Sequence, residues 1–443
     1  MREIYEGDLE MHELTRIISD YKAGKHSGIF SVCSSNKYVI EAAMDRLRDK
    51  DMFLLVEATA NQVDQFGGYT GMVPAQFRDF IYNLCEENNF PKERVILGGD
   101  HLGPLTWTHL EADKAMENAR ELIRQYVLAG FTKIHIDTSM QILGDKESGN
   151  FGDEIIADRA AQLCRVAEEA YSELKEKDST AIHPVYIIGS EVPIPGGAQE
   201  EEDHIQVTKV ANFESTVQSF KEAFEKHGVI DAFNYVIAVV VQPGVEFGSD
   251  SIFAYNRENA KELSEAIKKY DNLVFEAHST DYQTKQDLRN MVEDGYIILK
   301  VGPALTFGFR EGVFALNDIE EELLKYHPEF ELSKFREVLD FAMVKNPKQW
   351  KKHYIGSAEK IKFDRRYSLS DRCRYYMPDS DVEYALNMLL ENLSKVEIPL
   401  PLLSQYMHNQ YIKVRENKLS LNPEELLKDK IGEYIDDYIY AVS

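Results

Sequence analysis

The sequence predicts an α/β fold, a (β/α)8 TIM barrel with a C-terminal helical extension. Eight short apolar runs rich in β-branched residues recur along residues 1–310, with amphipathic stretches between them. Such near-continuous apolar runs are typical of parallel strands that are covered on both faces. Eight strand–helix units of this length fit a closed barrel, and an open, doubly wound sheet is the alternative architecture.

The strands are expected at intervals that leave room for a helix after each one. In chain order they are Gly28–Cys33, Phe53–Glu57, Arg94–Gly98, Lys133–Asp137, Pro184–Gly189, Tyr235–Val241, Asn272–Ala277 and Tyr296–Val301. Between them, a helical period of apolar residues is clearest in Ala112–Ala129, Asp158–Lys175 and Glu258–Tyr270.

The pattern changes after about Phe309, because no further run with the character of a buried strand follows. Helices are expected instead at Asn317–Tyr326, Leu332–Val344, Asp381–Ser394 and Asn422–Tyr440. We therefore divide the chain into a barrel, residues 1–310, which carries the active site, and a helical extension, residues 311–443. The extension is expected to cover the barrel or to form an oligomer contact, and a homo-oligomer is predicted.

The composition excludes several classes of protein. The 50 Lys and Arg residues against 76 Asp and Glu residues give a net charge of −26, which repels nucleic acid and anionic lipid. No run of about 18 apolar residues is present, and the first residues lack the basic-then-apolar pattern of a signal peptide. The four cysteines form no CxxC pair, which favours reduced thiols. A cytoplasmic protein without nucleic-acid or membrane partners is expected, and neither a Walker A nor a GxGxxG sequence supports nucleotide binding.

Polar side chains follow most of the predicted strands, at the end where (β/α)8 barrels carry their active sites. His101 and His278 are placed directly after strands, and Glu191 follows a third strand at the same height. Two imidazoles and a carboxylate with one open position form a common catalytic metal site. A divalent metal, with zinc as the first candidate, is therefore predicted on these residues. Individually, His101 could cap a helix and Glu191 could pair with a lysine.

Three further carboxylates at strand ends are candidates for acid–base catalysis: Asp100, Asp137 and Glu57. His135 and Asp137 point to the same side of their strand, so His135 is expected in a layer of the core below Asp137.

Loops after the later strands are a usual phosphate site in this architecture. The candidates are the backbone near Ser279 and Gly302, with Arg372 and Arg374 from residues 364–378, the one basic-aromatic stretch of the extension. The arginines could instead pair with some of the many carboxylates. Further polar residues at strand ends complete the predicted substrate-binding set: Asn61, Gln62 and Asp281.

Six motifs carry a resemblance to a known family: VEATANQVDQFGGYTGM (56–72), GGDHLGP (98–104), IGSEVPIPGG (188–197), EAHSTDYQ (276–283), KVGPALTF (300–307) and SDRCRYYMP (370–378). Together they resemble the GatZ/KbaZ family of D-tagatose-1,6-bisphosphate aldolase subunits over essentially the whole chain. The resemblance implies a barrel related to class II, zinc-dependent ketose-bisphosphate aldolases. It also implies two other roles, since some members are described as non-catalytic partners of a class II aldolase subunit and related barrels are ketose-phosphate 4-epimerases.

Residue by residue, the resemblance implies that Asp100 is the acid/base group and that His101, Glu191 and His278 bind zinc. Class II aldolases carry one more zinc-binding histidine after strand six. This chain has Gln242 there, and an amide oxygen is a much weaker zinc ligand than imidazole. That departure leaves open a site in which Gln242 assists and a site that has lost its metal.

The chemistry implied is metal-assisted cleavage of the C3–C4 bond of a ketose phosphate. Release of the aldehyde fragment would make the protein an aldolase, whereas rotation and re-addition would make it a 4-epimerase. Two further roles stay open: a stabilising subunit and a metal-dependent sugar isomerase on the same barrel. The polar loops at residues 141–154 and 192–212 are expected to act as lids over the substrate or as docking surfaces for an aldolase partner.

Overall fold

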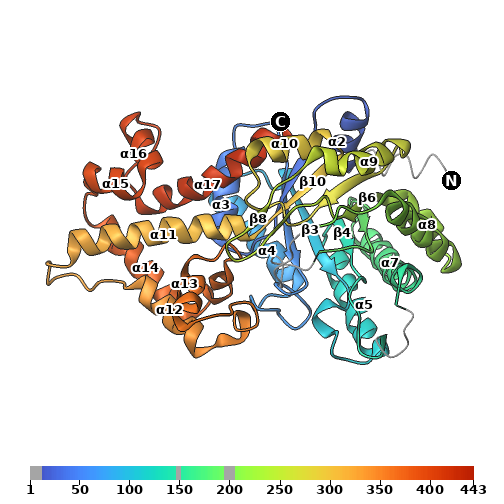
Figure 1. The fold of residues 1–443 in the computed structure, drawn as a ribbon, viewed down its shortest axis with the longest axis horizontal. Coiled ribbons are helices and arrows are strands. Elements are labelled where there is room, and N and C mark those ends of the chain that lie inside the picture. The colour runs from blue at the N-terminus through green and yellow to red at the C-terminus, as the bar shows by residue number, and fades with distance from the viewer. Residues whose placement is uncertain (1–11, 146–150, 194–204) are drawn as a thin grey trace.

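The computed structural model describes residues 12–145, 151–193 and 205–443, and its centre is a closed barrel of eight parallel strands (Figure 1). Around the barrel the strands follow the order β1-β10-β9-β6-β5-β4-β3-β2. Their bounds are Ile29–Val32 (β1), Leu54–Thr59 (β2), Val95–Leu102 (β3), Lys133–Ile136 (β4), Val185–Ile188 (β5), Val236–Val241 (β6), Val274–Ala277 (β9) and Tyr296–Val301 (β10).

Pairing between the first and last strands closes the barrel. β1 lies parallel to β10, with Ile29 opposite Ile298 and Val32 opposite Val301. Each barrel strand overlaps one of the eight predicted runs, so the predicted fold class is confirmed and the open sheet is excluded. The short antiparallel pair β7 (Glu246–Phe247) and β8 (Ile252–Phe253) was not predicted, and it lies in the loop after β6.

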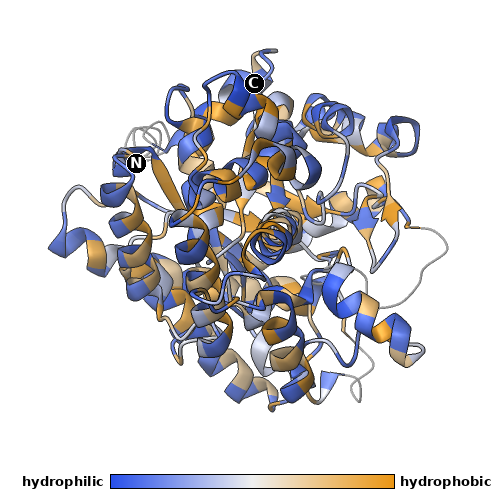
Figure 2. Ribbon diagram, turned by 90° about the vertical axis from the view of Figure 1, so that its left-hand side faces the viewer, coloured by the Kyte–Doolittle hydropathy of each residue, from blue (hydrophilic) through white to orange (hydrophobic). Residues whose placement is uncertain are grey.

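A ring of helices covers the outer face of the strands. The strands are largely hydrophobic in Figure 2, whereas the helices carry both hydrophobic and hydrophilic residues, as expected for amphipathic helices around a parallel sheet. The helices that follow the strands are α3 (Lys37–Leu47), α4 (Pro74–Glu87), α5 (Ala112–Leu128), α7 (Asp153–Lys177), α8 (Val210–Lys226), α9 (Arg257–Ala266), α10 (Lys285–Glu293) and α11 (Pro303–Leu324).

Helix α2 (Glu13–Lys22) crosses the end of the barrel where the strands begin. The ring of His12 contacts the carbonyl oxygen of Thr132, which precedes β4. At the other end of α2, Lys22 donates to the carbonyl oxygens of Ile267 and Tyr270, which precede β9. Helix α2 therefore covers this end of the barrel, and the opposite end remains for a pocket.

The extension consists of helices that pack on one side of the barrel (Figure 1). They are α12 (Phe335–Lys345), α13 (Ala358–Tyr367), α14 (Ser380–Ser394), α15 (Leu400–Tyr406), α16 (His408–Arg415) and α17 (Pro423–Val442). The predicted division at residue 310 falls inside α11, which continues without interruption to Leu324. That division stays a prediction.

The last helix, α17, completes the ring of helices around the barrel, because it packs against α3, α10 and α11. Arg46 on α3 pairs with Asp429 at 2.8 Å and with Asp436 at 3.0 Å. Gly432 permits this approach, since a Cβ atom there would collide with the Arg46 guanidinium. The extension is thus tied to the barrel by buried contacts. Within the described residues, no helix is long and apolar enough to cross a membrane.

Candidate active site

A pocket opens at the end of the barrel where the strands finish, and the extension supplies part of its wall. Arg374 and Tyr375 reach it from the single-turn helix Arg372–Tyr376. Its lining residues are Cys33, Thr59, Asn61, Gln62, Tyr69, Asp100, His101, Pro193, Phe247, His278, Ser279, Asp281, Lys300, Val301, Gly302, Pro303, Arg374 and Tyr375.

The backbone of β3 is irregular where it delivers His101 to the pocket. Its register against β4 shifts between Gly99 and Leu102, and His101 has a φ angle of 50°. The left-handed conformation is uncommon for residues other than glycine and is often found at functional sites. The His101 ring is held by Asp137, whose Oδ2 lies 2.7 Å from Nδ1. This leaves Nε2 free for the pocket side, 3.7 Å from Oδ2 of Asp100.

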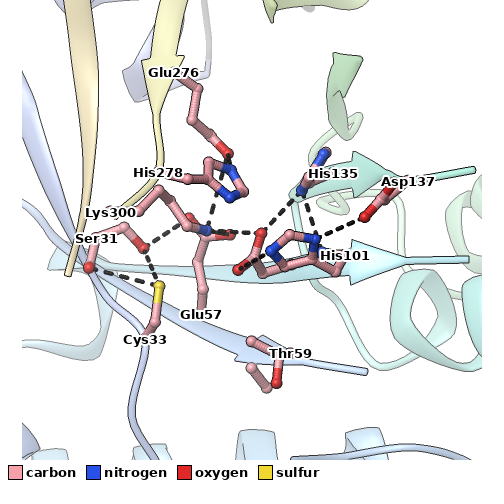
Figure 3. A network of polar contacts seen from close by, with 12 residues as sticks. Ser31, Cys33, Glu57, Thr59, His101, His135, Asp137, Glu276, His278 and Lys300 are labelled. Carbon is pink, nitrogen blue, oxygen red and sulfur yellow. Dashed lines mark hydrogen bonds and ion pairs between the residues drawn. The ribbon is translucent and has the colours of Figure 1, made fainter. Parts of the chain in front are cut away.

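Two more histidines lie beside His101, and each is also held by a carboxylate (Figure 3). Nε2 of His278 is 3.0 Å from Glu276, and Nδ1 of His135 is 2.9 Å from Asp100. The His278 ring stands nearly perpendicular to that of His101, with 4.8 Å between their centroids. Burial lowers the pKa of His278 to about 4, so this imidazole is neutral at pH 7 and able to bind a metal.

Two buried lysines fill the centre of the barrel below the histidines. Nζ of Lys133 contacts both Glu57, at 2.8 Å, and Glu276, at 2.6 Å. Nζ of Lys300 lies 2.7 Å from Glu57 and 3.0 Å from Asp100. Glu57 has room for these contacts because β3 carries Gly98 beside it, where a Cβ atom would lie 2.6 Å from the glutamate side chain.

The network shifts the pKa values of its members in directions set by their neighbours. Burial alone would raise the pKa of Asp100, but His101 and Lys300 hold it well below its usual range. Burial also raises the pKa of Glu276, and the ammonium groups of Lys133 and Lys300 more than reverse this effect. For His101, burial lowers the pKa, yet Asp100 and Asp137 raise it above the ordinary value.

The donor set fits a divalent cation. Asp100, His135, Glu276 and His278 each place one ligand atom within 4.8 Å of the others. His135 Nε2 is buried and has no hydrogen-bond partner among the described residues. The network also contains four carboxylates: Glu57, Asp100, Asp137 and Glu276. The two lysines offset half of their charge, so two negative charges remain before any histidine is protonated.

Comparison with known proteins places the chain in a family. Residues 14–443 match the model of the GatZ/KbaZ-like family, described as D-tagatose-1,6-bisphosphate aldolase subunit GatZ/KbaZ-like. The chain belongs to this family. The resemblance found in the motifs is therefore confirmed.

Two solved structures illustrate the range of similarity to this GatZ/KbaZ-like chain. A probable tagatose 6 phosphate kinase from Sinorhizobium meliloti 1021 is 41% identical, with a TM-score of 0.84, and the match covers 94% of this chain and 100% of that one. A fructose-bisphosphate aldolase from Campylobacter jejuni is 16% identical, with a TM-score of 0.40, and the match covers 86% of this chain and 91% of that one.

Most of the residues predicted from the sequence come together in this GatZ/KbaZ-like chain. The pocket is lined by nine of them: Asn61, Gln62, Asp100, His101, His278, Ser279, Asp281, Gly302 and Arg374. Glu57 and Asp137 do not line the pocket, but they lie directly behind it and hold Lys300 and His101. The roles assigned to these residues remain predictions.

Glu191 and Gln242 do not belong to the group of ligand atoms around His278, and their predicted role as metal ligands stays a prediction. The exposed Glu191 side chain, three residues beyond β5, accepts hydrogen bonds from Thr208 and Asn212, at 2.6 Å each. The amide oxygen of Gln242 accepts from the backbone N–H groups of Gly244 and Val245 in its own turn. His135 and Glu276 take their places beside His278.

The two arginines of the extension have different surroundings. Arg372 does not line the pocket; it is buried and donates to the carbonyl oxygen of Gln349, 3.1 Å away. Arg374 lines the pocket, stacks on Tyr375 and donates only to that hydroxyl and to two backbone carbonyls in the described structure. Among the described residues no carboxylate lies within 4.0 Å of Arg374, so its charge is available to an anion.

Asp281 occupies the backbone amides that were expected to bind phosphate. Its Oδ1 accepts from the N–H groups of Gly302 and Ala304, at 3.1 and 2.8 Å, and thereby covers the N-terminus of α11. Burial raises the pKa of Asp281 to about 6. The pocket therefore presents a carboxyl group, instead of free amides, at this point.

Sequence reasoning missed Lys133, Lys300 and Glu276 as members of the site. The available signal was a charged residue inside an apolar run that is otherwise typical of a buried strand. His135, expected in a core layer, is indeed fully buried. The expected lids, residues 141–154 and 192–212, lie partly outside the described residues.

Proposed function

We propose that this chain is a catalytic aldolase of the D-tagatose-1,6-bisphosphate type, which cleaves the C3–C4 bond of a ketose phosphate in the pocket described above. One observation carries the proposal: a carboxylate, two imidazoles and an ammonium group, Asp100, His101, His278 and Lys300, line the same pocket. These are the groups that proton abstraction and stabilisation of an oxyanion require. Membership of the GatZ/KbaZ-like family supports the same reaction class.

Asp100 is the proposed base. It is the one member of the predicted acid–base set that lines the pocket, and its depressed pKa keeps it ionised at neutral pH. Asp100 would take the proton from the C4 hydroxyl, so that O4 forms a carbonyl and the electrons of the C3–C4 bond move toward C2. Asp137 and Glu57 are then positioning residues, since they act through His101 and Lys300.

A divalent metal, with zinc as the first candidate, is proposed on His278 and on His101, which line the same pocket. His135 and Glu276, whose ligand atoms lie within 4.8 Å of one on His278, are available to complete the set. When bound, such an ion polarises a carbonyl oxygen as a Lewis acid. The neutral state of His278 and the carboxylates beside His101 and His278 suit this role, because ligating histidines usually donate their second N–H to such a group.

Arg374 is the proposed receptor for a substrate phosphate, since its guanidinium lines the pocket without a carboxylate partner in the described structure. Asn61, Gln62, Ser279 and the carboxyl group of Asp281 would bind sugar hydroxyls at the same rim. Phosphoryl transfer, which the name of the Sinorhizobium relative implies for that protein, has less support here, because the sequence has no Walker A motif.

Incubation of the purified chain with zinc and with D-tagatose 1,6-bisphosphate or D-fructose 1,6-bisphosphate tests the proposal. Triose phosphates are the expected products. Formation of the C4 epimer without trioses would identify a 4-epimerase instead. Turnover only after addition of a class II aldolase chain would identify a stabilising subunit, and that chain would then be the partner. The Asp100→Asn variant is the matched control, because it keeps the side-chain shape and removes the base.

A further inference from the structure

Lys300, which was not among the residues predicted from the sequence, is placed to act on the substrate. It lies on β10, is 4% exposed and lines the pocket together with Asp100. By contrast, Lys133, the other lysine of the network, is fully buried and does not line the pocket. The two lysines therefore share Glu57 and Glu276 as partners but differ in their access to a ligand.

The ammonium group of Lys300 is held by ion pairs with carboxylates and keeps an N–H group for a substrate. Glu57 and Asp100 lie 2.7 and 3.0 Å from Nζ, and Glu276 lies 3.9 Å away. Glu57 is itself fixed by Lys133 and by the hydroxyl group of Ser31. Yet Nζ of Lys300 has no aligned hydrogen-bond acceptor among the described residues. An ammonium group has three N–H donors, so the two short ion pairs anchor it and leave at least one donor for a substrate.

Cleavage of a C3–C4 bond requires two proton movements, one at the oxygen on C4 and one at C3. A proton leaves the oxygen on C4, and a proton must arrive at C3 after the bond has broken. The two atoms are separated only by C4. A base and an acid that touch each other can therefore serve both atoms from one side of the substrate, and Asp100 and Lys300 touch at 3.0 Å.

We infer that Lys300 is the catalytic acid that protonates C3. Asp100 then returns a proton to Lys300, which regenerates its ammonium form. This inference rests on the proposed aldolase function. Asp100 takes the O4 proton as the C3–C4 bond breaks and the C4–O4 carbonyl forms. The electron pair left on C3, shared with the C2 carbonyl, takes a proton from Nζ of Lys300. The neutral amine then takes the proton held by Asp100, so both groups return to their starting state and no outside proton is needed.

A Schiff base on Lys300 is the competing role for a buried lysine. That chemistry needs a neutral, nucleophilic amine. The ion pairs with Glu57 and Asp100 stabilise the ammonium form instead, and they hold it against the barrel floor. Proton donation is the role that this arrangement favours.

The decisive variant is Lys300→Arg, because a guanidinium keeps the positive charge but stays protonated in proteins. Cleavage of the ketose bisphosphate would be measured together with oxidation of the enediolate by hexacyanoferrate(III), which traps the species that awaits protonation. We expect Lys300→Arg to slow release of triose phosphate about 10²–10⁴-fold, while the ratio of trapped to released product rises. Lys300→Met should raise the same ratio, and metal content measured on each variant should match the wild type.

Lys133→Arg is the matched control, because it changes the contacts of Glu57 and Glu276 away from the pocket. It should leave the ratio of trapped to released product at the wild-type value. An unchanged ratio in both Lys300 variants, or an equal rise in Lys133→Arg, would overturn the role of Lys300 while the aldolase function stands. A lysine adduct trapped by borohydride on Lys300 would also overturn it. Wild-type protein that releases no triose phosphate would overturn the proposed function itself, and this inference with it.

Discussion

Nδ1 of His101 lies 2.7 Å from Oδ2 of Asp137, and this contact orients the imidazole toward the pocket. Asp137 is fixed in turn by Ser139, whose N–H and hydroxyl groups both donate to Oδ1. Carboxylates that hold a metal-binding histidine in this way set its tautomer and its basicity. The contact therefore links a residue that does not line the pocket to the chemistry inside it.

Asp137→Asn should weaken zinc binding about 10–100-fold, the usual effect of losing such a partner. It should also lower the pKa of His101, because Asp137 is one of the groups that raise it. A competition titration with a chromophoric chelator measures the first effect, and NMR titration of the metal-free protein measures the second. Ser139→Ala, which keeps the carboxylate, is the control and should change both quantities less.

The ligand atoms that the structure groups around His278 can be tested against the predicted ligand set. His278→Ala should abolish zinc binding, whereas Glu191→Gln should leave it unchanged, because Glu191 bonds to Thr208 and Asn212 away from the histidines. Metal analysis of the purified variants, with circular dichroism as a check on folding, makes the comparison. Loss of metal in Glu191→Gln would restore Glu191 as a ligand.

Gln242→His addresses the position where class II aldolases carry a further histidine. The side-chain oxygen of Gln242 accepts from two backbone N–H groups of its own turn. We therefore expect no gain in zinc affinity and a loss of about 1–3 kcal/mol in the free energy of unfolding, the usual net value of two lost hydrogen bonds. Chemical denaturation and the chelator titration measure the two quantities. Tighter zinc binding would show that a side chain at residue 242 can reach the metal.

The two arginines of the extension should separate substrate binding from stability. Arg374→Ala should raise KM for a phosphorylated ketose about 10–100-fold, the value of one charge-assisted hydrogen bond, and should matter less for the unphosphorylated sugar. Arg372→Ala should instead lower the melting temperature, since Arg372 is buried on Gln349 outside the pocket. Equal changes in KM for both sugars would remove Arg374 from the phosphate site.

The sequence was sufficient for the barrel and for those site residues that directly follow a strand. Buried parallel strands need continuous apolar runs. Asp100, near the end of β3, and His278, directly after β9, take their positions from those strands. Glu191 lies three residues beyond β5, where the path of the turn decides the direction of its side chain. Lys133 was missed because its charge is stabilised by Glu57 and Glu276, which come from distant parts of the chain.

The sequence also did not predict that α17 completes the ring of helices around the barrel. The amphipathic pattern of Asn422–Tyr440 predicted a helix, and the structure has one at Pro423–Val442. Its neighbours, however, depend on complementary surfaces such as Gly432 against Arg46, which no periodicity reveals. Local patterns therefore defined the elements, and contacts between distant residues defined their packing.

The buried carboxyl group of Asp281 should make stability depend on pH in an unusual direction. Its pKa is raised by burial from an ordinary value of 3.8 to about 6, so between these values the folded state keeps a proton that the unfolded state has lost. The contribution of Asp281 to the free energy of unfolding then falls as the pH rises through this window. Two pKa units correspond to roughly 3 kcal/mol.

Asp281→Asn should remove this dependence, because an amide does not ionise, while its Oδ1 can still accept from the N–H groups of Gly302 and Ala304. We expect the variant to match the wild type near pH 4 and to exceed its stability above pH 6. Urea denaturation of both proteins at a series of pH values measures the difference. A variant that is less stable than the wild type at pH 7 would mean that ionised Asp281 stabilises the N-terminus of α11 by more than its burial costs.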